Sequence, residues 1–498
     1  MIIPYFVIIP LSAAFLIALI SRKKENIAAG IALIVGIVLT IMSIYSFILL
    51  SKNEGAIYYH FSNWKAPVTI SLVLDYLSSF ILIIISVISL IAIFYSLQYT
   101  NHYTGKWQYF ALFMLMISGM NGVALTGDFF NFYVFMEITL FSAYSLVAFG
   151  CEAEELEAAF KYAIVGSISS TMILFAIGLL YSFTSTLNMA DVGRVLLNEK
   201  SKVIYLVYGM LIAGLGLKSA LVPFHAWLPD AHPSAPAPIS SMLSGVLIKV
   251  LGTYAMVRIF FNVFNAPQIF LQIMLILGTF SMVIGGLMSI MQWDIKRMLG
   301  YSTVSQIGYI FIGIGLGTPL GILGAIFYLL SHSIFKSLLF MNAGAVEYAL
   351  DTRDMRQMGA LNKKLPVTSF TSMIGSLSIS GIPPFNGFFA KLIIIIACIQ
   401  SAHPIYAGWA ILVSIITLAY YLKMQKHTFY GKPNFKKIYE KVPFTLKTSM
   451  IILAGLCIIS SILIIPGIKE VTLDKVTQVI LDKTDYIEYI RPLIMGGK

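Results

Sequence analysis

The sequence predicts an all-α integral membrane protein with about 14 transmembrane helices, in which helices 7 and 12 are broken within two inverted five-helix repeats. Of the 498 residues, 58% are hydrophobic and 11% charged, whereas about a quarter of a soluble chain is charged. Apolar runs of bilayer-spanning length recur from end to end, without the ten-residue alternation of a β-barrel. Prolines interrupt two runs close to a lysine, which is typical of transporter repeats.

The apolar runs follow one another with short connections and leave no room for a soluble domain. The first is too long and too apolar for a cleaved signal peptide, and the next follows at once. The mixed tail, 467–498, favours an amphipathic helix on the membrane surface. The expected spans are 1–21, 27–50, 70–97, 108–126, 129–150, 158–182, 203–222, 238–261, 267–290, 295–316, 319–346, 367–400, 405–425 and 447–466.

Lysines and arginines are unevenly divided between the two sets of loops. The odd-numbered loops hold about three times as many as the even-numbered ones, so both termini are expected outside the cell. This asymmetry largely explains the net charge of +11. Nucleic-acid binding is the weaker interpretation, because the basic residues lie in short loops between spans.

The three cysteines give no sign of a cofactor. Cys151, Cys398 and Cys457 are far apart and form no CxxC, which argues against an iron–sulfur cluster, a structural zinc or a disulfide framework. No GxGxxG follows a strand, and no Walker loop is present. We therefore expect no cofactor and no metal in this chain.

Six ionisable residues lie deep within the expected spans. Such a group costs about 2.5–3.5 kcal/mol at the bilayer centre on insertion scales, so it usually faces a partner or a wet cavity. One alternative is that Lys218, late in its span, extends its side chain to the interface. Another is that His332 is a core histidine, although Lys336 lies on the same helical face. The six are Glu137, Lys218, Lys249, His332, Lys336 and Lys391.

Together these residue types fit a proton path. Burial disfavours the charged form of a lysine, and a nearby carboxylate favours it, so a Glu/Lys pair loads or releases a proton when the partner moves. Histidine suits a relay between lysines because it titrates near neutral pH. The series supplies a switch, relays and an exit.

The two interrupted spans place a proline near a lysine in each half of the chain. Pro223 follows Lys218 by five residues, and Pro383 and Pro384 precede Lys391. A proline frees backbone carbonyls, which is tolerated where the backbone lines a protein-buried or wet cavity. Self-similarity is weak ("VPFHAW" against "PPFNGF"), so placement carries the repeat. The expected segments are 1–107 (three helices), 108–261 (first repeat), 267–430 (second repeat) and 447–498 (helix 14 and tail).

The first break is followed by a proline-rich loop with two histidines and an aspartate. We expect His225, Asp230 and His232 to cap and orient the broken helix. Metal binding is the alternative, but His–x6–His is not a usual ligand spacing.

Three strings together resemble a known family. "KSALVPFHAWLPDAHPSAPAPIS", "HSIFKSLLF" and "SLSISGIPPFNGFFAK" are similar to the antiporter-like proton-translocating subunits of respiratory complex I, Mrp-type cation/proton antiporters and membrane-bound hydrogenases. The resemblance runs from about residue 65 to about 430. It implies the 14-helix fold, a place in the cytoplasmic membrane of a prokaryote, and proton-relay roles for the same six residues.

Within that family, "TGDFFNFYVFMEI" looks most like the D-type subunit of Mrp Na⁺/H⁺ antiporters or its hydrogenase counterpart. The resemblance implies that the chain works beside similar membrane subunits and is not catalytic alone, with any Na⁺ moved through its neighbours. The acidic stretch "CEAEELEAAFK" is either a docking surface or a solvated helix start. The alternatives to proton transport are a complex I-like subunit that contributes to a quinone-linked redox reaction, and a scaffold with vestigial charges.

Overall fold

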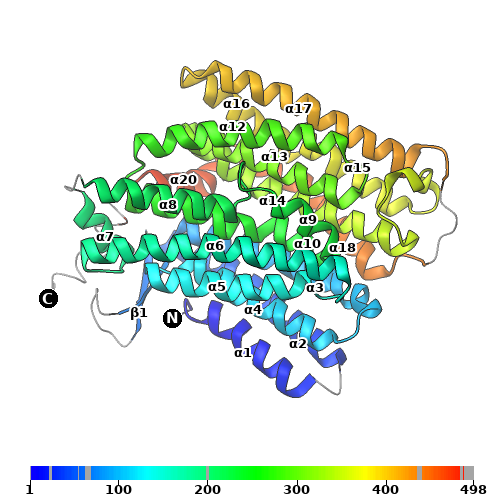
Figure 1. Cartoon of the computed structure of the whole chain (residues 1–498), viewed down its shortest axis with the longest axis horizontal. Helices are drawn as coiled ribbons and strands as arrows, with labels where there is room; N and C mark the ends of the chain where they lie inside the picture. Colours follow the sequence, from blue (N-terminus) through cyan, green and yellow to red (C-terminus); the bar gives the residue numbers. More distant parts are fainter. Residues whose placement is uncertain are drawn as a thin grey trace.

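Long helices that run side by side along the longest axis make up the molecule (Figure 1). Within the residues that the computed structural model describes, ten helices are long and apolar enough to cross a membrane, and two shorter helices are also apolar. The all-α prediction is confirmed, since the strands among the described residues are confined to one short hairpin. The described residues are 2–21, 25–53, 55–61, 69–197, 201–434, 440–482 and 486.

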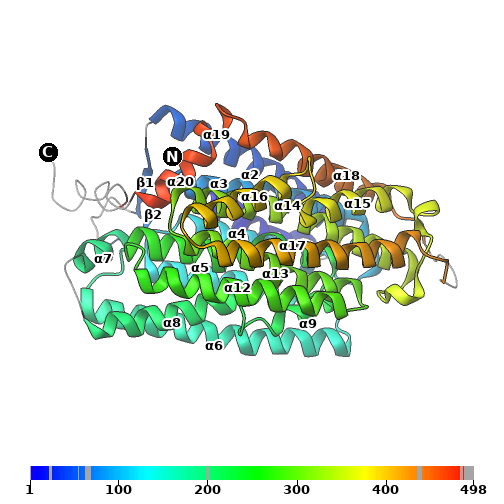
Figure 2. The same ribbon diagram turned by 90° about the horizontal axis from the view of Figure 1, so that it is seen from above.

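In Figure 1 the first half of the chain forms the lower part of the bundle. Seen from above, α6 and α8 form one edge, and α2 lies toward the other (Figure 2). The elements are α1 (Tyr5–Ile20), α2 (Glu25–Asn53), β1 (Ile57–His60), β2 (Ser71–Leu74), α3 (Tyr76–Tyr99), α4 (Lys106–Leu125), α5 (Phe129–Val147), α6 (Ala153–Thr184), α7 (Met189–Leu196), α8 (Lys202–Lys218), α9 (Trp227–Ser234), α10 (Ala237–Met242) and α11 (Ala255–Val257).

The second half supplies the rest of the bundle, with α16 and α17 at the margin opposite α1 (Figure 1). Its elements are α12 (Gln268–Met291), α13 (Ile295–Gly315), α14 (Pro319–Leu350), α15 (Pro366–Ser380), α16 (Asn386–Gln400), α17 (Pro404–Gln425), α18 (Phe444–Ile459), α19 (Ile468–Val471) and α20 (Leu473–Leu481).

Aspartate caps begin three of the buried helices. Asp75 accepts a hydrogen bond from the backbone of Ser78 at the start of α3, and Asp128 and Asp294 do the same at α5 and α13. An N-cap carboxylate satisfies amides that the helix leaves without a partner, which matters most where water is scarce. These caps set where the apolar helices start.

Both expected breaks are present. The first separates α8 from α9, and the second separates α15 from α16 at Gly381, whose positive φ ends α15. The Val222–Pro223 and Pro383–Pro384 peptide bonds are cis. One expectation was wrong, because the segment 223–237 is not only a loop: it contains the two-turn helix α9.

The tail packs on the bundle. In α20, Leu473, Val476 and Ile480 are buried, a spacing that gives a short helix one apolar face. This face lies against α3 and α14, so α20 is amphipathic as expected, but its apolar face packs on the bundle and not on the membrane surface. The remainder of the expected tail helix, 483–485 and 487–498, lies outside the described residues.

Candidate functional site

Lys218 is the last residue of α8, and its side chain is buried at the first break. Its ammonium Nζ donates hydrogen bonds to the Gly166 carbonyl at 2.8 Å and to Ser170 Oγ at 3.0 Å, both on α6. Glu137 of α5 is its carboxylate partner in the local electrostatics. Glu137 Oε1 is buried without a hydrogen-bond partner among the described residues. Three neighbouring helices therefore build the first Glu/Lys pair.

Lys249 lies at the start of a π-helical stretch, Lys249–Tyr254, in the middle of the span 237–263. Its side chain is buried, and Nζ folds back to the carbonyls of Ser244 at 2.6 Å and Gly245 at 2.8 Å. Wide π turns are rare and frequently mark functional positions. Here they place backbone acceptors around a buried ammonium.

Two glycines bring the helix of Lys249 against its neighbours on both sides. A Cβ on Gly252 would collide with Ser219, the residue after Lys218. A Cβ on Gly245 would collide with the Ser337 hydroxyl of α14. Small residues allow such close approach between membrane helices. The span 237–263 thus joins the first break to α14.

His332 and Lys336 are fully buried on consecutive turns of α14. Neither ring nitrogen of His332 has a hydrogen-bond partner among the described residues. Lys249, Lys336 and Lys391 all act electrostatically on this ring, so His332 lies among the three lysines. The i, i+4 spacing of His332 and Lys336 therefore places both side chains in the same buried cluster of ionisable residues.

A buried hydrogen-bond chain runs from Lys336 toward the second break. Lys336 Nζ donates to the Leu299 carbonyl at 2.8 Å and contacts the Tyr421 hydroxyl at 3.5 Å. From the Tyr421 hydroxyl onward, hydrogen bonds of 3.0–3.4 Å connect each side chain to the next as far as Gln306. The Tyr328 hydroxyl then donates a short hydrogen bond to Gln306 Oε1. The chain passes through Tyr421, Ser302, Tyr420, Gln306 and Tyr328.

Lys391 lies beyond the end of this chain, on α16. Its Nζ is buried without a hydrogen-bond partner among the described residues and lies 4.6 Å from the centre of the Tyr309 ring. The Tyr309 ring is 5.7 Å from that of Tyr328. Lys391 also lines a cavity of about 260 Å³ together with Ser414. Lys391 therefore faces an aromatic ring and a cavity, whereas Lys218 has hydrogen-bond acceptors and a carboxylate nearby.

The structure places the six predicted residues in one row, of which Glu137 is half-buried and the other five are buried. It starts at Glu137 and Lys218, continues through Lys249 to the α14 pair, and reaches Lys391 at the far side of the bundle.

The residues around the breaks have separate surroundings. Asp230 forms ion pairs with Arg297 at 3.1 Å and Lys161 at 3.9 Å. His232 is fully buried, with its ring 4.4 Å from that of Phe340. No group of three or more metal-ligating side chains gathers anywhere in the described part of the chain.

The remaining break residues lie at the turns themselves. Pro223 is exposed, and His225 buries its Nδ1 without a hydrogen-bond partner among the described side chains and backbone. At the second break Pro383 precedes Pro384, whose carbonyl accepts a hydrogen bond from Ser461 at 3.2 Å.

The sequence analysis missed two buried ion pairs. Arg258 contacts Asp75 at 2.7 and 2.8 Å, and both side chains are about 5% exposed. Lys296 is buried in the first turn of α13 and lies 2.6 Å from Glu347. Arg258 could have been found by its position inside an apolar run, whereas Lys296 stands at the start of one.

The comparison with known families identifies the family of the chain. The chain matches the family described as "NADH:quinone oxidoreductase/Mrp antiporter, TM" over residues 126–418. The chain belongs to this family. The resemblance seen in the sequence motifs is therefore confirmed, and the matched region holds all six residues of the row.

Two relatives and one solved structure extend the match over nearly the whole chain. The D subunit of the Na(+)/H(+) antiporter of Alkalihalophilus pseudofirmus is 32% identical over 474 residues, 94% of each chain. The N subunit of the NADH-quinone oxidoreductase of Desulforudis audaxviator is 34% identical over 431 residues, 85% of each chain. A chain of the Mrp complex from Dietzia sp. DQ12-45-1b superposes with a TM-score of 0.91 at 26% identity, covering 98% of this chain and 99% of that one. This member of the family is thus a multi-pass membrane protein.

Proposed function

We propose that this chain is a proton-translocating subunit of a multisubunit membrane complex, most like the D-type subunit of Mrp Na⁺/H⁺ antiporters. The observation that carries the proposal is the row from Glu137 to Lys391, which is buried from Lys218 onward. Five of its six members are cations or potential cations held at most 3% exposed inside an apolar bundle. Such placement is costly and marks ion pathways in membrane proteins.

The row divides the work between its members. Glu137 favours the charged form of Lys218, and movement of Glu137 frees the Lys218 proton for Lys249. Lys249 passes charge to the α14 pair, and His332 relays it because a neutral imidazole both accepts and donates a proton. Lys391 is the exit. Lysines repel Na⁺, so we assign protons to this chain and Na⁺ to its neighbours.

Fourteen spans, ten of them in two inverted five-helix repeats at 108–261 and 267–430, are part of the proposal. The two breaks support this arrangement, because each half of the chain contains one broken helix with a lysine beside the break: Lys218 in the first half and Lys391 in the second. The starts of α5 and α13 give a second parallel between the two halves. The cap residue Asp128 forms an isolated antiparallel β-bridge with Asn188, and the cap residue Asp294 forms one with Asp354. The segments 1–107 and 447–498 then flank the repeats.

Both termini are proposed to lie outside the cell, in a prokaryotic cytoplasmic membrane. The start of α1, the β1–β2 hairpin, α7 and α20 lie at one end of the bundle (Figures 1 and 2). The basic connections around residues 353–364 and 423–432 lie at the other end. The positive-inside rule assigns that end to the cytoplasm.

An exposed apolar strip on α5 supports a neighbouring membrane subunit beside Glu137. Phe130, Val134 and Phe141 are 37–65% exposed, and Glu137 lies on the same strip. Lipid covers what such a subunit leaves free. In this arrangement the neighbour sets the position of the Glu137 carboxylate and so couples the two chains.

A quinone-linked role in a complex I-like assembly is the second candidate. The relative from the NADH-quinone oxidoreductase of Desulforudis audaxviator favours it, at 34% identity. We assign no cofactor to this chain itself. The two functions differ in one requirement, because the quinone-linked role needs an electron donor and a quinone for proton movement.

The test is proton movement by the complete complex in proteoliposomes, comparing wild type with Lys249→Ala and Glu137→Ala. Native gels establish that each variant assembles. Loss of transport in both assembled variants supports the row as the path. Wild-type rates in both would make these charges structural and overturn the proposal, and strict dependence on added quinone and donor would favour the second candidate.

A further inference from the structure

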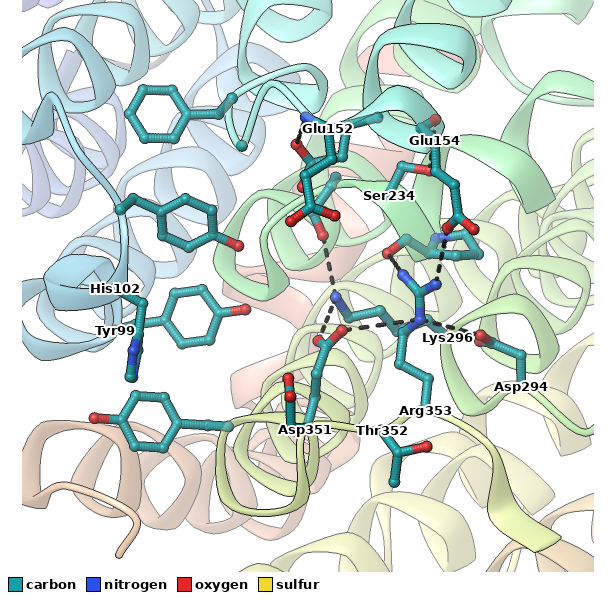
Figure 3. A pocket seen from close by; sticks show the side chains of 18 of the residues that line it. Tyr99, His102, Glu152, Glu154, Ser234, Asp294, Lys296, Asp351, Thr352 and Arg353 are labelled. Carbon is teal, nitrogen blue, oxygen red and sulfur yellow. Dashed lines mark hydrogen bonds and ion pairs between the residues drawn. The ribbon is translucent and has the colours of Figure 1, made fainter. Parts of the chain in front are cut away.

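A polar cavity of about 760 Å³ opens at the end of the bundle where α6 and α13 begin and α14 ends (Figure 3). Its wall also includes residues 233–235, at the C-terminal end of α9. Acidic side chains predominate over the basic ones, Lys296 and Arg353, and over His102. The acidic lining residues are Glu152, Glu154, Glu155, Asp294, Glu347, Asp351 and Asp354.

Lys296 sits at the bottom of this cavity and is only 2% exposed. Its Nζ lies 2.6 Å from Glu347 and donates a hydrogen bond to the Ala235 carbonyl at 3.2 Å. Arg353 holds the surrounding wall, with contacts of 3.2 Å to Asp294 and 3.9 Å to Glu347 (Figure 3). The pair of Lys296 and Glu347 is thus the boundary between an open acidic cavity and the buried interior.

His232 lies directly behind that boundary. It precedes the wall segment 233–235, is fully buried, and has no hydrogen-bond partner for either ring nitrogen among the described residues. Lys296 and Lys336 both act on it electrostatically. The Phe340 ring lies against His232, and Lys336 Nζ is 5.8 Å from the same ring. One imidazole therefore separates the cavity pair from the central row.

We propose that this cavity is where protons enter the chain, and that Lys296 and Glu347 deliver them to His232. The inference rests on the proposed function and adds residues that the row does not contain. The Glu347 carboxylate takes up a proton from solvent, which releases Lys296. The Lys296 ammonium gives its proton to neutral His232, and the Glu347 carboxylic acid restores the ammonium. The net result is one solvent proton on His232, with the pair returned to its starting state.

The surroundings of the pair are compatible with this cycle. Burial raises the pKa of the Asp294 carboxyl beside it, although a backbone hydrogen bond from Arg297 opposes this. A carboxyl that protonates readily keeps protons available at the cavity floor. The other titratable or charged groups facing the pair are Glu155, Arg353, His232, Tyr95, Tyr99 and Tyr103.

The experiment uses the complete complex in proteoliposomes and measures proton uptake from each side. Glu347→Gln is compared with Asp351→Asn, which also removes one negative charge from the cavity wall. Asp351 makes no ion pair with Lys296 among the described contacts, and its positive φ suits asparagine. We expect Glu347→Gln to lower the uptake rate at least about tenfold, with the roughly hundredfold contribution of a proton-transferring side chain as the full effect. Asp351→Asn should keep most of the rate.

A second readout separates delivery from a purely structural tie. Glu347→Gln should raise the half-saturating proton concentration on the cavity side and leave that on the opposite side unchanged. Glu347→Asp, which restores a carboxylate, should recover part of the rate. Lys296→Met is the companion variant, and if it fails to assemble, Glu347→Gln decides alone because glutamine still accepts a hydrogen bond from Lys296.

The outcomes distinguish this inference from the function on which it rests. If Lys249→Ala abolishes transport but assembled Glu347→Gln matches wild type on both sides, the inlet is elsewhere and this inference is wrong. Equal losses in Glu347→Gln and Asp351→Asn would also overturn it, since cavity charge alone would then explain the effect. If Lys249→Ala transports normally as well, the proposed function itself fails.

Discussion

The two broken helices carry equivalent lysines in different surroundings. At the first break, Lys218 is held by a carbonyl and a hydroxyl of α6, with Glu137 nearby. At the second, Lys391 has no hydrogen-bond acceptor among the described residues and faces the Tyr309 ring and a small cavity. Hydrogen bonds and an opposite charge favour the ammonium form, and a ring face does so weakly. We therefore expect the first break to hold a proton until its partner moves, and the second to release one.

Removing either lysine is expected to have the largest effect. Lys218→Ala and Lys391→Ala should each lower proton transport by about a hundredfold, the scale of a lost proton-transfer group. Transport by the assembled complex measures this. If one variant retains wild-type transport, the row does not need both breaks, and the comparison reduces to a single functional lysine.

The glycines beside the two lysines test the packing of each break. A Cβ on Gly166 would collide with the Tyr144 hydroxyl, so Gly166→Ala should cost about 1–3 kcal/mol of stability through overpacking. Gly381→Ala should cost about 1–2 kcal/mol for a different reason, its left-handed backbone. Thermal melting of the purified complex compares them, with Gly178→Ala as control because its Cβ would meet no atom within 4 Å. Unchanged melting in both would show that neither break is tightly packed.

Glu137 should act on the first break only. Glu137→Gln is expected to lower transport about tenfold, in line with typical coupling energies between sites. Combined with Lys218→Ala it should add little, whereas combined with Lys391→Ala its effect should be fully additive. Additive losses in both double variants would mean that Glu137 does not work through Lys218.

Tyr309 should act on the second break only, and with the smallest effect. Tyr309→Leu removes the ring beneath Lys391 and should change transport by about fivefold, since a cation–π contact contributes about 1 kcal/mol. Tyr309→Phe keeps the ring and loses only the hydroxyl contacts to Ala410 and Ser414, so it is the matched control. Equal effects in the two variants would assign the role to the hydroxyl.

Much of the bundle and of the row follows from local properties of the sequence. An apolar run is long enough to span a bilayer or it is not, and an ionisable residue in its middle has no route to water. Glu137 and Lys249 were therefore visible without coordinates. The helix α9 was not, because the prolines and two histidines within 223–237 are typical of a loop.

The cavity pair and the hydrogen-bond chain escaped prediction for physical reasons. Lys296 follows the cap residue Asp294, where a charge normally faces solvent, and only the approach of α14 and residues 233–235 buries it. Tyr420 and Gln306 are ordinary helix residues in sequence, and hydroxyls and amides give no strong pattern because partners elsewhere satisfy them cheaply.

The sequence by itself determined that this protein spans a membrane many times, that two of its helices break beside a lysine, and that six ionisable residues lie within its apolar runs. Each of these depends on residues near one another in the chain. Only the tertiary structure decided that Lys218 has acceptors while Lys391 has a ring, that Lys296 is buried against Glu347, and that His232 stands between that pair and Lys336. These depend on contacts between helices far apart in sequence, where the free energy of a buried charge is set by whichever groups surround it.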